Sequence, residues 1–192
     1  GLTVLGSISN RSVAMFAQQQ LTMQSVALVN EQGKVASQQG VQLDVGQVNN
    51  TDGLINAKTG LRVQAQELQN LRGELSSAAS LALSSTKVHN ASGTLVSGGD
   101  LSIQAVAVEN GQGVIRTNQA LSIAATQLDN QQGQVSSLGG LNLHVQDALL
   151  NQAGQVATGG ELVVTVASMN NQGGSVGSQG AFNLTATQGI DN

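Results

Sequence analysis

The sequence predicts an all-β protein, a parallel β-helix of about nine coils, each roughly 20–21 residues long. Three observations predict this fold. An Asn recurs at a nearly constant interval along the whole chain, and a Gly follows most of these Asn residues by three positions. Between one Asn and the next, apolar and polar residues alternate, which is the period of a half-buried strand. The Gly and Asn positions then mark the corners between short strands.

The stretch from Gln127 to Val145, QLDNQQGQVSSLGGLNLHV, shows the repeat most clearly. An apolar residue lies two positions before Asn130, Gly133 follows three positions after it, and an aliphatic residue lies two beyond the Gly. An L-x-L-x-V strand pattern comes next. The recurring Asn residues are Asn10, Asn30, Asn50, Asn70, Asn90, Asn110, Asn130, Asn151, Asn171 and Asn192.

Each repeat therefore reads as three short strands around a bend, with every second side chain pointing inward. Because equivalent positions recur once in every repeat, successive coils must lie directly over one another. With strands about 4.8 Å apart, the stack forms a rod roughly 45 Å long. We treat residues 1–192 as one β-helix segment. A leucine-rich repeat has a similar period and remains the alternative, although it needs a helix or other covering segment on its convex side.

The Asn column falls on the inward side of its strand, and we predict an amide ladder in which each side chain hydrogen-bonds to the next along the axis. We expect the Gly column to hold a corner where the backbone φ angle is positive. Val13 replaces Gly in the first repeat, so a different, looser corner is expected there. The proposed structural residues are Asn30, Asn50, Asn70, Asn90, Asn110, Asn130, Asn151 and Asn171, with Gly33, Gly53, Gly73, Gly93, Gly113, Gly133, Gly154 and Gly174.

Two repeats carry one extra residue at the same corner, between Val145 and Leu149 and between Ala186 and Ile190. An outward bulge absorbs such an insertion without disturbing the inward side chains. Neither insertion is long enough to form a lid or a binding loop.

Composition excludes several functions. Seven Lys and Arg residues are spread thinly over a chain of net charge −4, whereas a nucleic-acid partner requires clustered cations. No apolar run approaches the roughly 18 residues of a membrane helix, so we expect no membrane insertion. The absence of Cys excludes disulfides, thiolate metal sites and thiol catalysis. We expect no cofactor. The chain starts at Gly1 without a signal segment, which suggests a fragment or processed chain.

Enzymatic activity needs carboxylates, Arg or Lys converging on one face, usually beneath long loops. The outward residues of the longest strand are mostly neutral. Asp44 and Arg62 lie near each other diagonally on this face, and we interpret them as a surface ion pair of small energetic value. No sequence motif of a hydrolase, a metalloprotease or a phosphate loop occurs. We therefore expect no catalytic residues.

The closest approach to a site is the column of His89, Glu109 and Asp129, at the same outward position in three successive coils. A metal site would need ligands that converge on one point, whereas these residues fan out along the axis. We interpret them as a solvated stripe and expect no metal. His144 and Asp147 lie beside the first insertion, and we expect their pairing to be local and structural.

The segment LSIAATQLDNQQGQVSSLGG, Leu121–Gly140, resembles the haemagglutinin repeat of two-partner-secretion exoproteins, which include filamentous haemagglutinin adhesins and contact-dependent growth inhibition proteins. The resemblance extends over essentially the whole chain. It implies a right-handed β-helical filament that is exported through an outer-membrane transporter and is displayed on, or shed from, the bacterial surface. It also implies that the secretion domain and any toxin lie outside this segment. The family supplies no catalytic motif.

The expected function is the structural shaft of such a secreted adhesin or growth-inhibition exoprotein, projecting a distal binding or effector region. The alternative is an adhesive module whose polar face itself binds a host glycan or protein. Both ends of the segment would expose unpaired strand edges, which favour pairing with another strand. We therefore expect neighbouring β-helix segments of the same chain at both ends, and some self-association of the isolated segment.

Overall fold

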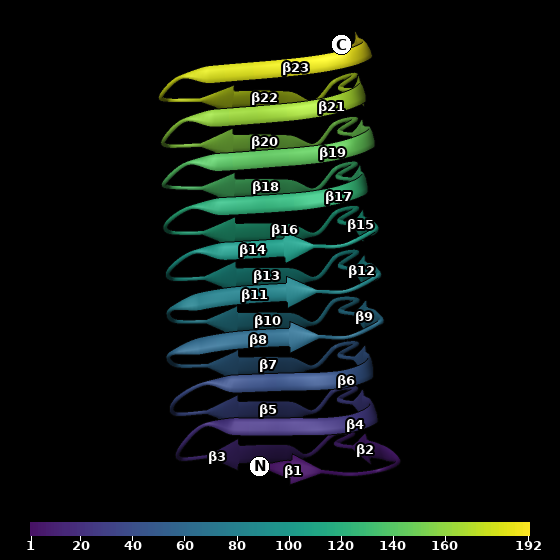
Figure 1. Ribbon diagram of the computed structural model, residues 1–192, viewed down its shortest axis with the longest axis vertical. Coiled ribbons are helices and arrows are strands. Elements are labelled where there is room, and N and C mark those ends of the chain that lie inside the picture. Colours follow the sequence, from purple (N-terminus) through teal and green to yellow (C-terminus); the bar gives the residue numbers. More distant parts are fainter.

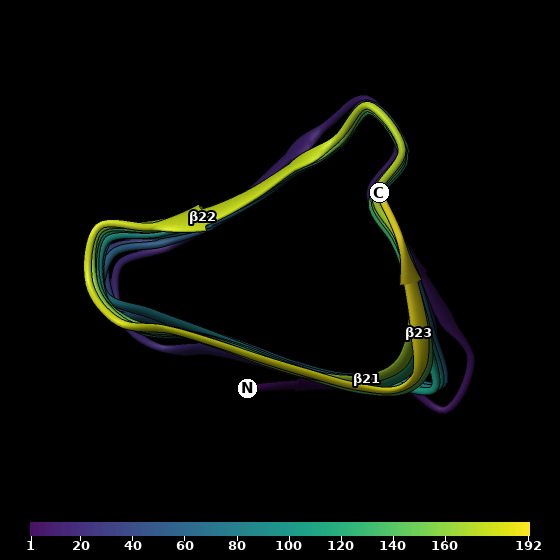
Figure 2. The same cartoon turned by 90° about the horizontal axis from the view of Figure 1, so that it is seen from above.

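The structure, a computed structural model, describes residues 1–192 as a single stack of β-strands without any helix. The chain crosses the near face from left to right, returns across the far face and rises from the N-terminus to the C-terminus (Figure 1). Seen along the axis, the coils superimpose as a triangle (Figure 2). This path is a right-handed parallel β-helix, and the predicted fold is confirmed.

In most coils, two sides of the triangle are formed either by one long strand that bends at the corner or by two separate strands. The third side is formed by one short strand. The strands are β1 (Leu2–Thr3), β2 (Ser7–Ser9), β3 (Ala14–Ala17), β4 (Leu21–Val29), β5 (Lys34–Ser37), β6 (Val41–Asn49), β7 (Leu54–Ala57), β8 (Gly60–Gln64), β9 (Glu67–Gln69), β10 (Glu74–Ser77), β11 (Ser80–Ser84), β12 (Lys87–His89), β13 (Thr94–Ser97), β14 (Leu101–Gln104), β15 (Ala107–Glu109), β16 (Val114–Thr117), β17 (Leu121–Asp129), β18 (Gln134–Ser137), β19 (Leu141–Leu150), β20 (Gln155–Thr158), β21 (Leu162–Asn170), β22 (Ser175–Ser178) and β23 (Phe182–Asp191).

These strands form two parallel sheets, one of 14 strands and one of nine. The larger sheet provides two walls: the long wall, which contains β8 and its equivalents, and the short wall, which contains β9 and its equivalents. The nine-stranded sheet is the back wall. Since all three walls are strands, no covering segment of the leucine-rich-repeat type exists, and that alternative is wrong.

Successive strands pair in register, so that equivalent residues of neighbouring coils lie side by side. In the long wall Leu61 pairs with Leu81, and Leu81 pairs with Leu101. The aliphatic residues at the predicted inward positions form one continuous core of 36 buried residues. At the third inward position burial is less complete, and Ala65, for example, is only partly buried against this core. The core is thus a stack of similar aliphatic layers, without aromatic residues.

The two predicted insertions form outward bulges. The pairing of β17 with β19 shifts by one residue after Val145, and the pairing of β21 with β23 shifts after Ala186. Gln146 and Asp147 of the first bulge are exposed, whereas Leu149 beyond it is fully buried. The predicted bulges are confirmed, because the inward set of side chains continues unchanged past the first of them.

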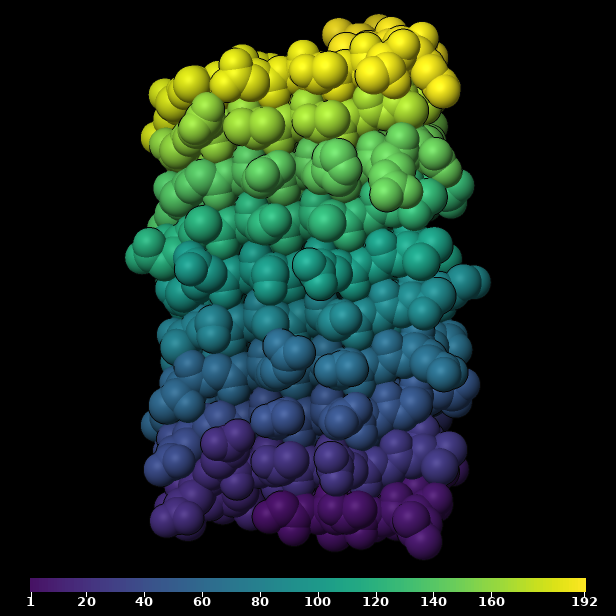
Figure 3. Space-filling model, in the orientation of Figure 1, coloured from purple at the N-terminus to yellow at the C-terminus, as the bar shows by residue number.

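The space-filling view shows the rod as a pile of side-chain rows, one row for each coil (Figure 3). No long loop leaves the stack in the ribbon view (Figure 1). The structure offers no helix with the length and apolarity needed to span a membrane.

Candidate functional site

The Asn column runs through the interior of the corner between the short wall and the back wall. The side-chain Nδ2 of each Asn donates to Oδ1 of the Asn in the next coil, with N–O distances of 2.6–2.8 Å from Asn10 through to Asn192. The seven residues from Asn30 to Asn151 have no exposed surface. The predicted amide ladder is present in every coil.

Each amide also fixes the backbone of its corner. Nδ2 of Asn50 donates to the carbonyl oxygen of Gly53 in its own coil at 3.1 Å and to that of Glu74 in the next coil at 3.1 Å. The backbone N–H of Gly53 closes the turn by donating to the Asn50 carbonyl at 3.0 Å. One side chain therefore donates to carbonyl groups in two coils, and it adds a second donor to the Gly53 carbonyl, which also accepts the backbone N–H of Glu74 at 2.9 Å.

The predicted reason for the Gly column is wrong. Positive φ angles occur one residue earlier, and Gly33, for example, is not in that conformation. The residues that adopt it, with φ between 52° and 58°, are Ser12, Gln32, Asp52, Arg72, Ser92, Gln112, Gln132 and Ala153, and Gly173 follows them at 65°. The corner thus holds ordinary side chains at its left-handed position, and these side chains are exposed to solvent.

Glycine is required at this position by close packing between coils. A Cβ atom on Gly113 would overlap the carbonyl oxygen of Asn90 in the coil below, and it would lie 2.6 Å from Oδ1 of Asn110. The same overlap holds at all eight positions from Gly33 to Gly174. Only a residue without a side chain lets the two backbones approach so closely.

The expectation of a different corner at Val13 is also wrong. Ser12 has a φ angle of 55°, as its equivalents do, and Asn10 donates to the Val13 carbonyl at 3.2 Å. Val13 itself is 57% exposed. Within residues 1–192 no Asn carbonyl of an earlier coil faces Val13, and the corner has the same shape as its equivalents.

A second polar column lies at the corner between the back wall and the long wall, and sequence reasoning missed it. Its buried members are Ser37, Ser77, Ser97, Thr117, Ser137 and Thr158. Oγ of Ser97 donates to Oγ1 of Thr117 at 3.0 Å, and the Ser137 and Thr158 hydroxyls lie 2.9 Å apart. Thr117 and Thr158 also donate to backbone carbonyls of the turn in the preceding coil. Strand parity was the available signal, because each of these residues lies two positions after a buried aliphatic residue.

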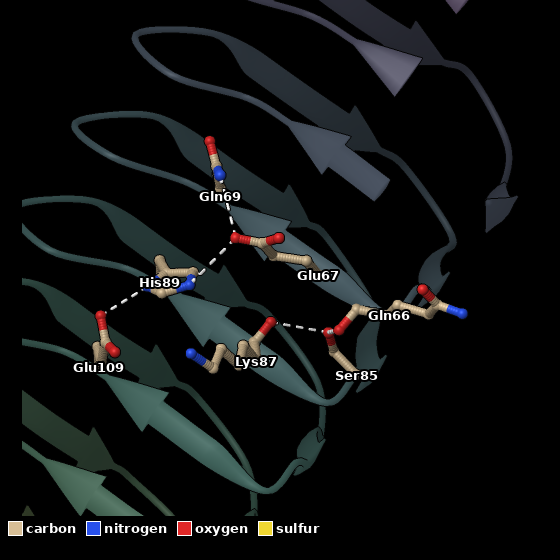
Figure 4. Close-up of polar contacts among 7 residues, drawn as sticks. All are labelled: Gln66, Glu67, Gln69, Ser85, Lys87, His89 and Glu109. Atoms are coloured by element: carbon tan, nitrogen blue, oxygen red, sulfur yellow. Dashed lines mark hydrogen bonds and ion pairs between the residues drawn. The ribbon is translucent and has the colours of Figure 1, made fainter. Parts of the chain in front are cut away.

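The predicted outward stripe becomes a three-residue cluster on the short wall (Figure 4). Nδ1 of His89 lies 2.6 Å from Oε2 of Glu109 in the next coil, and Nε2 lies 3.3 Å from Oε1 of Glu67 in the preceding coil. Nε2 of Gln69 donates to the same Glu67 oxygen at 3.0 Å. Asp129 does not join this cluster, because its carboxylate accepts the backbone N–H of Gln131 at 2.9 Å.

This cluster links coils rather than forming a reaction centre. The two ring nitrogens of His89 point in opposite directions along the axis, so its two carboxylate partners do not converge on one point. No group of three or more His, Cys, Asp or Glu side chains is placed to hold a metal ion. Glu67 was missed because it lies two positions away from the His89 column, on the adjacent coil.

Other predicted pairs do not form. Arg62 makes no ion pair with Asp44, because the in-register neighbours of Arg62 are Gln42 and Ala82, while Asp44 pairs with Gln64. The ion pairs between Arg and carboxylates are Arg11 with Glu31 and Arg72 with Asp52. His144 and Asp147 likewise form no ion pair.

Arg72 and Asp52 flank each other at the exposed, left-handed position of neighbouring Asn corners. Nε of Arg72 donates to Oδ1 of Asp52 at 2.8 Å, and a second guanidinium nitrogen donates to Oδ2 at 2.9 Å. These hydrogen bonds, with the Coulombic attraction, lower the pKa of Asp52 and raise that of Arg72. This ion pair links two neighbouring coils on the outer surface of the corner, and the Asn ladder links the same coils in the interior.

Comparison with protein families identifies this repeat. The family model for the haemagglutinin repeat matches residues 2–86, 65–153 and 145–192, which together extend over nearly the whole chain. Searches of curated proteins and of solved structures gave no match. The matched segments contain every coil that carries the Asn ladder and its Gly column. The chain therefore belongs to the haemagglutinin repeat family.

Proposed function

We propose that this segment is the structural shaft of a secreted filamentous adhesin or contact-dependent growth inhibition exoprotein. Its role is mechanical rather than catalytic: it projects a distal binding or effector region from the bacterial surface. The observation that supports this role most directly is the Asn ladder, which continues through every coil without a loop or gap. Such a column couples each coil to its neighbours, as a one-dimensional array requires.

The family membership supports a secreted or surface-exposed location and export by an outer-membrane two-partner-secretion transporter. A chain exported unfolded must fold outside the cell, and a coil-by-coil array suits that requirement, since each new coil pairs with one already formed. Neighbouring β-helix segments of the same chain would then cover the end coils. Inward-facing Phe182 and Ile190 of the last coil are 46% and 47% exposed in this segment.

The test is a pair of deletions in the full-length exoprotein. Removing residues 91–130 deletes two whole coils and joins Asn90 to Gln131, so the register of every column is kept. We expect normal secretion and undiminished activity of the distal region. Removing residues 91–120 is the control, since it deletes one and a half coils, breaks the register and should abolish secretion of folded protein. Loss of distal activity from the displayed, folded two-coil deletion would contradict a spacer role.

The second candidate is an adhesive module, in which the polar outer face binds a host glycan or protein. The observation that favours it is an unpaired arginine between two hollows of the long wall, described below. Labelled, folded segment should then bind intact epithelial or bacterial cells saturably, and sugars should compete. Absence of binding would leave the shaft as the only function.

A further inference from the structure

Arg62 is a free cation on an otherwise neutral part of the long wall. It points outward from β8 and is exposed, and it forms neither an ion pair nor a side-chain hydrogen bond. Its in-register neighbours, Gln42 in β6 and Ala82 in β11, carry no charge. Its guanidinium donors are therefore available to a ligand.

Two hollows meet at this arginine. One, of about 410 Å³, lies toward the back-wall corner and is bordered by amide and hydroxyl side chains such as Gln39, Thr59 and Ser80. The other, of about 220 Å³, extends along the axis over Ser84 and Ser102. Arg62 is the only charged residue in either lining.

The hollow along the axis exists because the outward residues beyond Arg62 are small. Ala82, Ser102 and Ser122 follow it at the same position in the next three coils, whereas Gln42 precedes it and Asn142 closes the row. The long wall runs straight in the axial view (Figure 2), and its rows of side chains are exposed to solvent (Figure 3). An extended ligand can therefore lie along the axis across several coils.

We propose that Arg62 and these two hollows bind an acidic polysaccharide, with the carboxylate of one sugar unit on the guanidinium and neighbouring sugar hydroxyls on the amide and hydroxyl side chains. This inference rests on the adhesive candidate above and names its ligand class. The planar fork of Arg matches a carboxylate through two parallel hydrogen bonds. Neutral amides and hydroxyls match the donors and acceptors of sugar rings.

The surroundings argue against other anionic partners. A peptide that binds by strand addition needs a free sheet edge, and both edges of β8 are paired, with β6 and β11. A nucleic acid needs several cations close together, whereas this site has one on a chain of net charge −4. A polysaccharide with widely spaced carboxylates fits one arginine among neutral groups.

Affinity for a single site should be low. The chain contains no Trp or Tyr, so no indole or phenol ring can stack on a sugar. Binding then depends on one charge-assisted contact and several neutral hydrogen bonds at an exposed surface. Repetition of weak sites on a filament would raise the apparent affinity through multivalency.

The test is a titration of the isotope-labelled, folded chain with a hyaluronan tetrasaccharide, in which carboxylated sugars alternate with neutral ones, followed by NMR. We expect shifts at Arg62, Ser84 and Ser102, and at least tenfold weaker binding of the fully methyl-esterified, uncharged tetramer. Arg62→Gln should weaken binding tenfold or more. Arg116→Gln is the matched control, since it removes the same charge from an exposed, unpaired arginine on the back wall and should leave binding unchanged. Ala82→Gln, which fills the hollow and keeps Arg62, should also weaken binding.

Equal binding of the charged and the esterified tetramer would overturn the carboxylate assignment. Equal losses in Arg62→Gln and Arg116→Gln would overturn the site and indicate general electrostatic attraction. Neither result contradicts the proposed shaft function, because a shaft requires no ligand. If Arg62→Gln segment still bound cells as the unmodified segment does, the adhesive function would stand with a different site.

Discussion

The two polar corners of the coil differ in how completely their side chains satisfy the backbone. At the Asn corner, the amide is the same in every coil and the residue before the glycine position is always left-handed, with φ angles confined to 52–65°. At the hydroxyl corner, the column contains both Ser and Thr and is interrupted by Ala17 and Ala57. Viewed along the axis, the Asn corners superimpose, whereas the hydroxyl corners spread outward from the N-terminal to the C-terminal coils (Figure 2).

The comparison shows what the choice of side chain controls. An amide offers two donor hydrogens and an acceptor, enough to bind the coil above, the coil below and its own turn. A hydroxyl has a single donor hydrogen, so it can donate either to a turn carbonyl or to a neighbouring hydroxyl, but not to both. A column whose side chains bond to both neighbouring coils and to the turn holds the corner in one position. A column with fewer hydrogen bonds allows the position of the corner to vary from coil to coil. The following predictions test that difference, from the largest expected effect to the smallest.

The largest effect should come from breaking the ladder in the middle. Asn110→Leu keeps the volume but leaves Oδ1 of Asn130 without a donor, removes the amide acceptor of Asn90, and removes a donor from the carbonyl groups of Gly113 and Gln134. Because each unsatisfied buried group costs about 1–3 kcal/mol, we expect a loss of about 3–5 kcal/mol in the free energy of unfolding. Chemical denaturation followed by circular dichroism measures it. Asn118→Leu, at an exposed position of the opposite turn, is the control and should change stability little.

Closing the gap beside the ladder should have the next largest effect. Gly113→Ala places a methyl group on the Asn90 carbonyl, and we expect a loss of about 2–3 kcal/mol, as for other overpacked positions. Gly111→Ala is two residues away and meets only an ordinary contact of 3.8 Å with the Gln131 carbonyl. If both variants lost the same stability in denaturation, glycine flexibility rather than close approach would explain the column.

The hydroxyl corner should respond less. Thr117→Val removes a buried hydroxyl that accepts from Ser97 and from the Gln119 N–H, and we expect a loss of about 1–2 kcal/mol. Ala57→Ser restores a missing hydroxyl between Ser37 and Ser77 and should change stability by less than about 0.5 kcal/mol. Thermal unfolding of both variants checks the ranking. A Thr117→Val loss equal to that of Asn110→Leu would remove the distinction between the corners.

The smallest effect should be found outside the Asn corner, at Asp52 and Arg72. The lowered pKa of Asp52 means that this exposed pair stabilises the fold above the ordinary carboxyl pKa of about 4, and that the contribution fades as the pH falls below it. Asp52→Asn should therefore be slightly less stable than the unmodified chain at pH 7 and equally stable at pH 2. Denaturation at the two pH values measures this. A difference that grew in acid would contradict the sign.

Sequence reasoning could reach the fold because the information is periodic. Leu128, Leu141 and Leu143 alternate with polar residues, which predicts that they are buried. Equivalent residues recur at a fixed interval, which predicts that they stack on one another in successive coils. The amide ladder was predictable for the same reason, since Asn130 has the parity of the core. The reason for glycine at Gly133 was not predictable. The constraint comes from a carbonyl group of another coil, and the sequence does not show which atoms lie next to a residue along the axis.

The surface was harder to predict because its contacts depend on rotamers and on small offsets between coils. Asp44 and Arg62 are diagonal neighbours by position, yet their side chains do not meet. Glu67 contacts His89 although it belongs to a different column. In the hydroxyl column, Ala57 interrupts a pattern that is otherwise clear in Ser97 and Thr117. One substitution of this kind hides a column whose other members are buried.

The ladder also gives the rod a direction. In every step Nδ2 belongs to the earlier coil and Oδ1 to the later one, so the amide dipoles inside the corner all point the same way. The two ends of the stack therefore present opposite faces: an oxygen acceptor at the N-terminal side and an N–H donor at the C-terminal side. A further coil can extend this column in one orientation only, because an inverted coil would set donor against donor or acceptor against acceptor. The hydrogen-bonded column in the interior therefore makes the two ends of the rod chemically different.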